Sequence, residues 1–289
     1  MVLRKNFILK KLGTIQSFPV LPDTVFALAK ALDENRELPE IVALAERDVA
    51  LTTNVLKLVN SAYYRGPSRA AIGNLEEAIV RLGLHEFERI ALSFSALHSF
   101  KGFGTGAVFA DFWKHSMIVA GTCARAYEIL YEEKLDRRAG RDLYTLGLLH
   151  DVGILILDFY FPELYQRVVK HFDRKLNLDL PEFEFDVLGL THEDIGAWAM
   201  ARWNLPQLFI DCIGHHHREG YQGPYTKELR VLRLVNDMTT CHETGTLATY
   251  DPSDLTLRSE LEELQFKLKV RFVTEEVFRA ADELVQQLQ

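Results

Sequence analysis

The chain has 289 residues and a mass of 33.1 kDa, with 48% apolar and 26% charged residues. This composition is typical of a globular protein with a sizeable core, and it excludes disordered, collagen-like and coiled-coil classes. With 33 basic against 41 acidic residues, the formal net charge is −8. We therefore expect no nucleic-acid partner, because that function needs clustered positive charge.

The first hundred residues carry apolar side chains at helical spacing, without sustained period-two alternation. This spacing predicts helices at 24–32, 40–46, 51–60, 75–82 and 85–99. Pro39 suits the first turn of the second helix, where its missing donor costs nothing. Asn74, with Glu77 three residues later, resembles a capping box, and Gly83 supplies a helix end. The glycine-rich segment 101–107 is the best candidate for a hinge between two lobes.

The helical pattern continues in the second part of the chain. We expect a long helix at 112–130, a charged loop at 132–142, and then helices at 142–160, 163–172, 193–202, 207–216, 227–241 and 275–288. Pro162 and Pro206 interrupt this pattern, and no segment predicts a strand. The sequence therefore predicts an all-α fold.

The cysteines and the most apolar stretch indicate a cytoplasmic protein. The three cysteines form no CxxC pair, so neither a disulfide framework nor a zinc ribbon is expected. The most apolar stretch, 144–161, contains three ionisable residues that would be costly in lipid. The basic start of the chain has no clear apolar signal region. We therefore expect a soluble protein with no membrane segment.

Histidines are concentrated after the glycine-rich segment. Seven of the ten fall within about a hundred residues, namely His115, His150, His171, His192, His215, His216 and His217. His150 is followed by Asp151 inside the apolar run LGLLHDVGILIL. Burying this pair is costly unless each side chain has a partner, and a cation would satisfy both. A core histidine bonded to neighbouring protein groups is the alternative.

Other candidate ligands accompany this pair. His115 lies within a predicted helix, His192 opens one, the histidines at 215–217 end one, and Asp237 lies in the apolar stretch RLVNDMTT. Helices from separate parts of a chain can present such ligands inward. Imidazole and carboxylate ligands without thiolate suit iron, manganese, zinc or nickel. Spacing alone leaves both a metal site and a set of core histidines open.

The order His115, His150-Asp151, Asp237 resembles the HD superfamily of metal-dependent phosphohydrolases. The wider text of residues 14–240 is similar to the HDOD domain, most specifically LVNSAYY at 58–64 and WNLP at 203–206. Within the first motif, Asn60 and Ser61 either brace helices or recognise a partner. The resemblance implies an N-terminal helical lobe (1–105) packed on an HD-type lobe (106–240), with a C-terminal helical extension (241–289) on the latter. It also implies a bacterial protein of signalling and regulation.

The resemblance further implies a ligand set for one or two divalent transition-metal ions. His115, His150, Asp151 and Asp237 match the four HD ligands. His192, His216 and His217 resemble the additional ligands of HD-GYP phosphodiesterases, which leaves His215 as the outsider of the triple. Two departures argue against cyclic di-GMP hydrolysis. Ile154 stands where HD-GYP proteins carry lysine, and Arg218 stands where they carry glutamate.

Two functions follow as hypotheses. The first is an HDOD signalling or regulatory protein that retains the metal site and acts through unidentified protein partners. The alternative is a metal-dependent phosphohydrolase, a phosphodiesterase or nucleotide phosphatase, with a phosphoester ligand and Asp151 as its catalytic group. Lys114, Arg141 and Arg218 are then either phosphate contacts or solvated charges. An open coordination position would favour the enzyme, and a sealed site the structural role.

Overall fold

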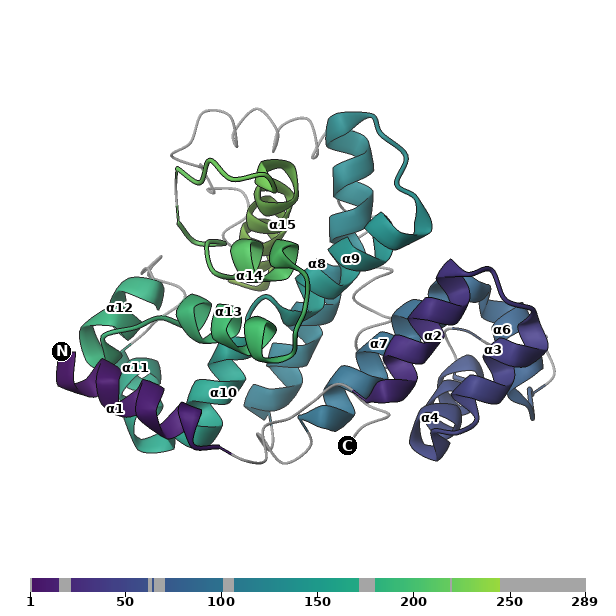
Figure 1. The fold of residues 1–289 in the computed structure, drawn as a ribbon, viewed down its shortest axis with the longest axis horizontal. Helices are drawn as coiled ribbons and strands as arrows, with labels where there is room; N and C mark the ends of the chain where they lie inside the picture. Colours follow the sequence, from purple (N-terminus) through teal and green to yellow (C-terminus); the bar gives the residue numbers. More distant parts are fainter. Residues whose placement is uncertain are drawn as a thin grey trace.

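The structure is a computed structural model that describes residues 2–15, 22–61, 64, 71–100, 107–171, 180–218 and 220–244. The regular secondary structure of these residues is helical throughout, which confirms the all-α fold (Figure 1). Segment 101–106 of the expected hinge, the expected helix at 275–288 and nearly all of the C-terminal extension lie outside the described residues.

Five helices form the right-hand part of Figure 1: α2 (Asp23–Asp33), α3 (Leu38–Ala45), α4 (Val49–Val59), α6 (Leu75–Leu82) and α7 (Leu84–Ser99). Their bounds confirm the predicted helices to within two residues. The Asn74 side chain accepts from the Glu77 backbone N–H, and Gly83 adopts a φ of 81° between α6 and α7. Asn60 braces the end of α4, because its amide bonds to the carbonyl groups of Leu56 and Ile72 and to the Ile72 N–H.

The remaining helices form the centre and left of Figure 1: α8 (Ala107–Tyr131), α9 (Arg137–Leu149), α10 (Val152–Tyr160), α11 (Pro162–His171), α12 (Leu180–Leu188), α13 (His192–Arg202), α14 (Gln207–Ile213) and α15 (Thr226–Thr244). α8 packs along α9 and α15, and α10 packs against α13. Helix α1 (Val2–Gly13) also lies here, since the Phe7 and Phe161 rings are 6.3 Å apart and Lys11 donates to the Tyr160 carbonyl oxygen. The lobe bounds inferred from the resemblance stay a prediction.

Two sequence predictions in this part are wrong. The helix expected at 142–160 is two helices, α9 and α10, with a break at His150 and Asp151. The expected charged loop is helical from Arg137, because the Asp136 side chain caps α9 by accepting from the Ala139 N–H at 2.7 Å. Helices α1 and α12 had no counterpart in the sequence-based expectation.

The α9–α10 segment is long and apolar enough to span a membrane by length and composition alone. Most of it is buried: 78% of its most apolar 18-residue stretch lies inside the fold. Burial among other helices of the same chain explains its apolar character.

Glycines allow the close helix crossings around the break. A Cβ at Gly147 would lie 2.7 Å from the Ala120 Cα on α8. A Cβ at Gly153 would collide with the His192 carbonyl oxygen at the start of α13. The backbones of α9 and α10 therefore approach α8 and α13 more closely than a larger residue would permit.

Candidate metal centre

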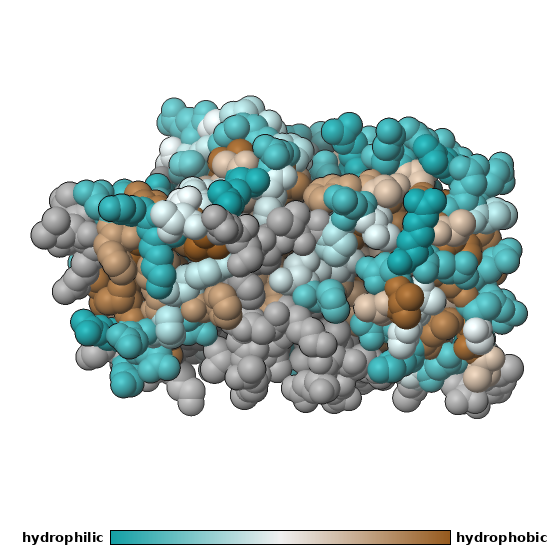
Figure 2. Space-filling model, turned by 60° about the horizontal axis from the view of Figure 1, so that its bottom comes forward, coloured by the Kyte–Doolittle hydropathy of each residue, from teal (hydrophilic) through white to brown (hydrophobic). Residues whose placement is uncertain are grey.

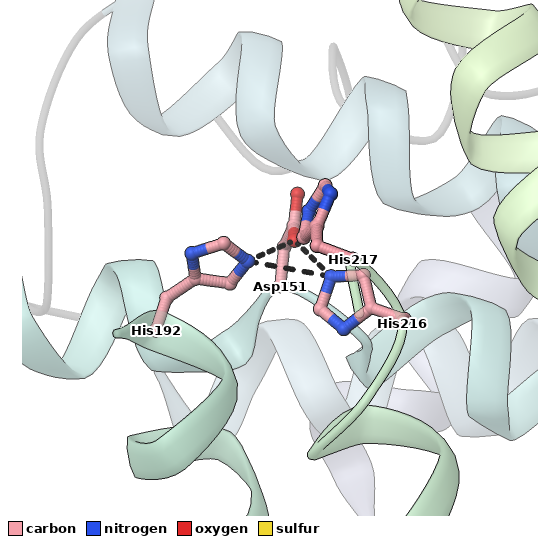
Figure 3. Close-up of side chains that lie close together, drawn as sticks. All are labelled: Asp151, His192, His216 and His217. Carbon is pink, nitrogen blue, oxygen red and sulfur yellow. Dashed lines mark hydrogen bonds and ion pairs between the residues drawn. The ribbon is translucent and has the colours of Figure 1, made fainter. Parts of the chain in front are cut away.

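Four side chains from three parts of the chain converge near the break between α9 and α10 (Figure 3). Asp151 lies in the break itself. His192 is the first residue of α13. Thr191, which precedes it, forms a capping box with Asp194. His216 and His217 lie in the turn that follows α14. The convergence expected from the positions of these residues is present.

The spacing of the ligand atoms fits a metal ion. Asp151 Oδ1 lies 3.4 Å from His192 Nε2 and 3.2 Å from His216 Nε2, and the two nitrogens are 3.3 Å apart. Around an ion with bonds of about 2.0–2.1 Å, the edge of a ligand tetrahedron is about 3.3 Å. All three measured separations are close to that edge.

Hydrogen bonds on the far side of each ring orient the ligands. His216 Nδ1 donates to the Ile213 carbonyl oxygen at 2.8 Å, and His150 Nδ1 donates to the Gly147 carbonyl oxygen at 2.8 Å. His192 Nδ1 donates to the Glu184 carboxylate at 2.7 Å. The Nε2 atoms face the centre, and because these partners hold a proton on Nδ1, Nε2 is the nitrogen that can bind a metal ion.

The second oxygen of Asp151 faces another histidine. Asp151 Oδ2 lies 3.2 Å from His150 Nε2, a fully buried nitrogen that makes no hydrogen bond. His115 completes this second group of nearby ligand atoms. Its two ring nitrogens lie 2.9 Å from Asn236 Oδ1 and 3.1 Å from Glu243 Oε2, so metal binding would require His115 to exchange one of these partners. Asp151 thus directs one carboxylate oxygen toward each of the two groups of ligand atoms.

The charges of the centre follow from its burial. Burial alone would raise the pKa of Asp151, but His150, His216 and His192 hold that pKa well below its ordinary value. Burial lowers the pKa of His150 and of His217, and Asp151 only partly offsets this effect. Burial also opposes the charged form of His192, but the Glu184 carboxylate outweighs it and raises the pKa of His192 to about 9. Without metal, a proton on His192 therefore lies where an ion would bind.

The remaining predicted ligands take different places. His217 belongs to the first group and is partly exposed. His215 donates to the Asp211 carbonyl oxygen at 2.7 Å, and its ring lies 5.2 Å from the Tyr221 ring, so it is outside the centre. Asp237 is half-buried on α15 and belongs to neither group of nearby ligand atoms. Its role as a ligand stays a prediction.

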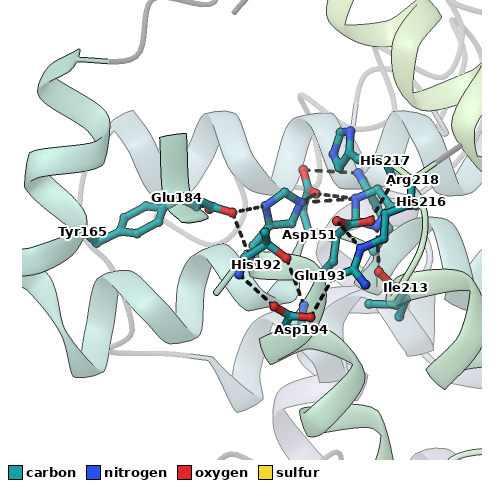
Figure 4. Close-up of polar contacts among 12 residues, drawn as sticks. Asp151, Tyr165, Glu184, His192, Glu193, Asp194, Ile213, His216, His217 and Arg218 are labelled. Atoms are coloured by element: carbon teal, nitrogen blue, oxygen red, sulfur yellow. Dashed lines mark hydrogen bonds and ion pairs between the residues drawn. The ribbon is translucent and has the colours of Figure 1, made fainter. Parts of the chain in front are cut away.

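Sequence reasoning missed the acidic residues that hold the ligands in place. Glu184 on α12 is fully buried, and its carboxylate accepts from Tyr165 Oη and from the His192 N–H and Nδ1–H (Figure 4). Glu193 is also buried and accepts from the His217 N–H at 2.9 Å. Glu184 lies in the segment PEFEFD, which has the composition of an exposed helix end. Only the tertiary partners distinguish it from its exposed neighbours.

The two arginines considered as phosphate contacts are balanced by carboxylates. Arg141 forms ion pairs with Asp33 and Glu88, at 2.8 and 3.0 Å. Arg218 forms ion pairs with two residues in the first turn of α13, Asp194 at 2.8 Å and Glu193 at 3.4 Å. Both guanidinium groups therefore have carboxylate partners, and their role as phosphate contacts stays a prediction.

The HDOD domain model matches residues 18–219 of the chain, which is more than half of its length. The chain belongs to the HDOD domain family. A protein of Treponema pallidum (strain Nichols) described as uncharacterized is 29% identical over 208 residues, which are 70% of this chain and 38% of that protein. The match to this HDOD chain therefore spans well under half the length of that relative.

Two solved structures share the fold of this HDOD protein. An HDOD domain protein of unknown function from Geobacter sulfurreducens has a TM-score of 0.72 at 22% identity, with 98% of each chain covered. A protein from Marinobacter aquaeolei VT8, provisionally named a signal transduction protein, has a TM-score of 0.74 at 22% identity, with coverage of 92% of this chain and 60% of that one.

Proposed function

We propose that this HDOD protein binds one or two divalent transition-metal ions around Asp151 and acts in signalling or regulation through protein partners. The spacing of Asp151, His192 and His216 carries the metal proposal, because three buried ligand atoms lie one coordination edge apart. Nitrogen and oxygen ligands suit iron, manganese, zinc or nickel. A cation would also satisfy the buried His150 Nε2.

The surface supports a partner-dependent role. Apolar side chains are exposed in both parts of the molecule, with Val49 and Val80 exposed on α4 and α6, and Phe7 and Val169 on α1 and α11. Brown areas lie toward both ends of the face in Figure 2, on either side of grey residues. The buried, free cysteines suit a reducing, cytoplasmic setting. The provisional name of the Marinobacter protein belongs to the same class of function.

Metal analysis tests the first part of the proposal. The full chain is purified without chelator or affinity-column metal, and its metal content is measured beside that of Asp151→Ala and His215→Ala. We expect at least one equivalent in the wild type and in His215→Ala, and a large loss in Asp151→Ala. Well under one equivalent in the wild type, unchanged in Asp151→Ala, would contradict the proposal.

A metal-dependent phosphohydrolase is the second candidate, and the bridging position of Asp151 favours it. Two-metal hydrolases share a carboxylate between their ions, and a bound ion lowers the pKa of its water and stabilises phosphate oxygens. Asp151 would offer one oxygen to each ion, and His217 is the least buried of the four residues in the first group.

A phosphoester panel assayed with iron, manganese and zinc separates the candidates. Turnover that is lost in Asp151→Ala would establish the enzyme. We expect none with cyclic di-GMP, because the aliphatic side chain of Ile154 offers no positive charge to a phosphate. Ile154→Lys is the matched variant for that substrate.

A further inference from the structure

Glu184 connects the metal centre to two helices that supply no ligand. It lies on α12, and Tyr165, which donates to Glu184 Oε1 at 3.1 Å, lies on α11. The other oxygen, Oε2, accepts from both the backbone N–H and the Nδ1–H of His192, each at 2.7 Å. Glu184 and His192 are both completely buried. All these contacts lie on the side of His192 that faces away from Asp151 (Figure 4).

Burying the Glu184 carboxylate costs free energy, because it loses its hydration. A buried carboxylate needs several partners to offset its lost hydration, and two of the three donors to Glu184 belong to His192. The two bonds from one residue fix both the start of α13 and the rotation of the imidazole ring. With the ring held there, Nε2 faces Asp151 Oδ1 and His216 Nε2.

We infer that Glu184 is a positioning residue of the metal centre, and that it forms a carboxylate–histidine–metal triad with His192 and the ion bound by Asp151, His192 and His216. This inference rests on the proposed metal function. A carboxylate behind the ring increases the basicity of the ligand, and loss of such a partner commonly weakens metal binding by 10–100-fold. Tyr165 orients the carboxylate and has a smaller effect of the same sign.

Glutamine is the informative replacement for Glu184. An amide has the same shape, so its oxygen can accept from both His192 donors while its nitrogen donates to Tyr165 Oη. Glu184→Gln therefore removes the charge and keeps the hydrogen bonds. Glu182→Gln is the matched control, because it makes the same change at an exposed position of α12.

The experiment uses Co²⁺ as the probe with the 289-residue chain after chelation and dialysis. Affinity is measured by competition with a chromophoric chelator, and the visible absorption of bound Co²⁺ reports the ligand geometry. His192→Ala and His115→Ala assign each bound ion to its side of Asp151. We expect Glu184→Gln to weaken the ion assigned to His192 by about 10–100-fold and to alter its spectrum, with no change in Glu182→Gln. Tyr165→Phe should weaken the same ion by a few-fold.

The outcomes separate the inference from the function on which it rests. If the wild type binds no ion at all, the proposed metal function fails and the inference fails with it. If it binds only an ion that His115→Ala loses and His192→Ala keeps, the metal function stands and the inference is overturned. The inference concerns the ion that His192→Ala loses. If the wild type binds this ion and Glu184→Gln binds it equally well, only the inference is overturned. An equal loss of affinity in Glu182→Gln would also overturn the inference. So would full affinity in Glu184→Asp, if circular dichroism shows that Glu184→Gln is unfolded.

Discussion

Two glycines without a Cβ atom help to set the positions of the ligands in the candidate centre. Gly153, two residues after Asp151, faces the carbonyl oxygen of His192, the residue that supplies a ligand nitrogen from α13. The absent Cβ of Gly153 lets the two backbones meet, and this contact sets the separation of Asp151 and His192. Gly196, one turn further along α13, likewise leaves room for the Ile213 side chain before the His216 turn.

Gly153→Ala tests this contact. The added methyl group meets backbone atoms of His192 and Gly196, which cannot rotate away, so α13 must move. Overpacking of this kind commonly costs about 1–3 kcal/mol of the free energy of unfolding, and metal affinity should fall as the ligands separate. Urea unfolding and Co²⁺ binding measure the two effects.

Gly140→Ala is the matched control for that substitution. Its Cβ would meet only the His85 Cε1 atom, at an ordinary 3.7 Å. Because alanine favours a helix over glycine, this variant should gain roughly 0.5–1 kcal/mol. Equal effects of the two substitutions would show that helix propensity, and not the α10–α13 contact, determines the result.

At the scale of elements, α9 joins the two parts of the described fold. Arg141 in its first half is only 11% exposed and makes two hydrogen bonds to Asp33 on α2 and one to Glu88 on α7. Arg137 donates to the Leu32 carbonyl oxygen at the same interface. Arg141 holds the pKa of Asp33 below its ordinary value, whereas burial raises the pKa of Glu88. The helix that ends at His150 is therefore anchored at its other end to α2 and α7.

Arg141→Ala should strongly destabilise the protein. It leaves Glu88, whose side chain is only 4% exposed, as a buried carboxylate without its cation. Removing one partner of a buried pair commonly costs about 3–5 kcal/mol. Arg138→Ala is the control on the same helix, because Arg138 is 71% exposed and its pair with Asp142 is weak at 4.0 Å. The control should change the free energy of unfolding by about 0.5 kcal/mol or less in urea. A similar small change in Arg141→Ala would exclude a structural role for the pair.

The elements also show what sequence reasoning could reach. Apolar periodicity located α2, α3, α4, α6, α7, α8, α11 and α13–α15 because their buried faces repeat at helical spacing. Apolar periodicity could not locate the break at His150 and Asp151. The apolar residues continue on both sides of these two residues, and no proline marks the end of α9. The start of α9 had a signal, Asp136 before Arg137, but the surrounding charges favoured a loop. Glu184 had none, because its burial depends on α11 and α13.

At the scale of the whole molecule, the centre joins segments that are distant in the chain. Its ligands come from the α9–α10 break, the start of α13 and the turn after α14, and α12 orients one of them. With an ion bound as proposed, none of these ligand segments could unfold locally without losing it. Binding to the folded state alone stabilises it in proportion to the logarithm of the metal concentration. Metal should therefore stabilise the molecule as a unit.

This coupling predicts a metal-dependent unfolding temperature. At about 100 times the dissociation constant, a bound ion adds roughly 2.7 kcal/mol, or about 5–10 °C for a chain of this size. Asp151→Ala should abolish this shift, because its two oxygens serve both groups of ligands. His215→Ala should retain it, because that ring bonds to Asp211 and lies outside the centre. Thermal unfolding of the three proteins with added Mn²⁺ or Zn²⁺, and again with chelator, measures the difference. A shift that persists in Asp151→Ala would place the stabilising metal at other residues of the chain.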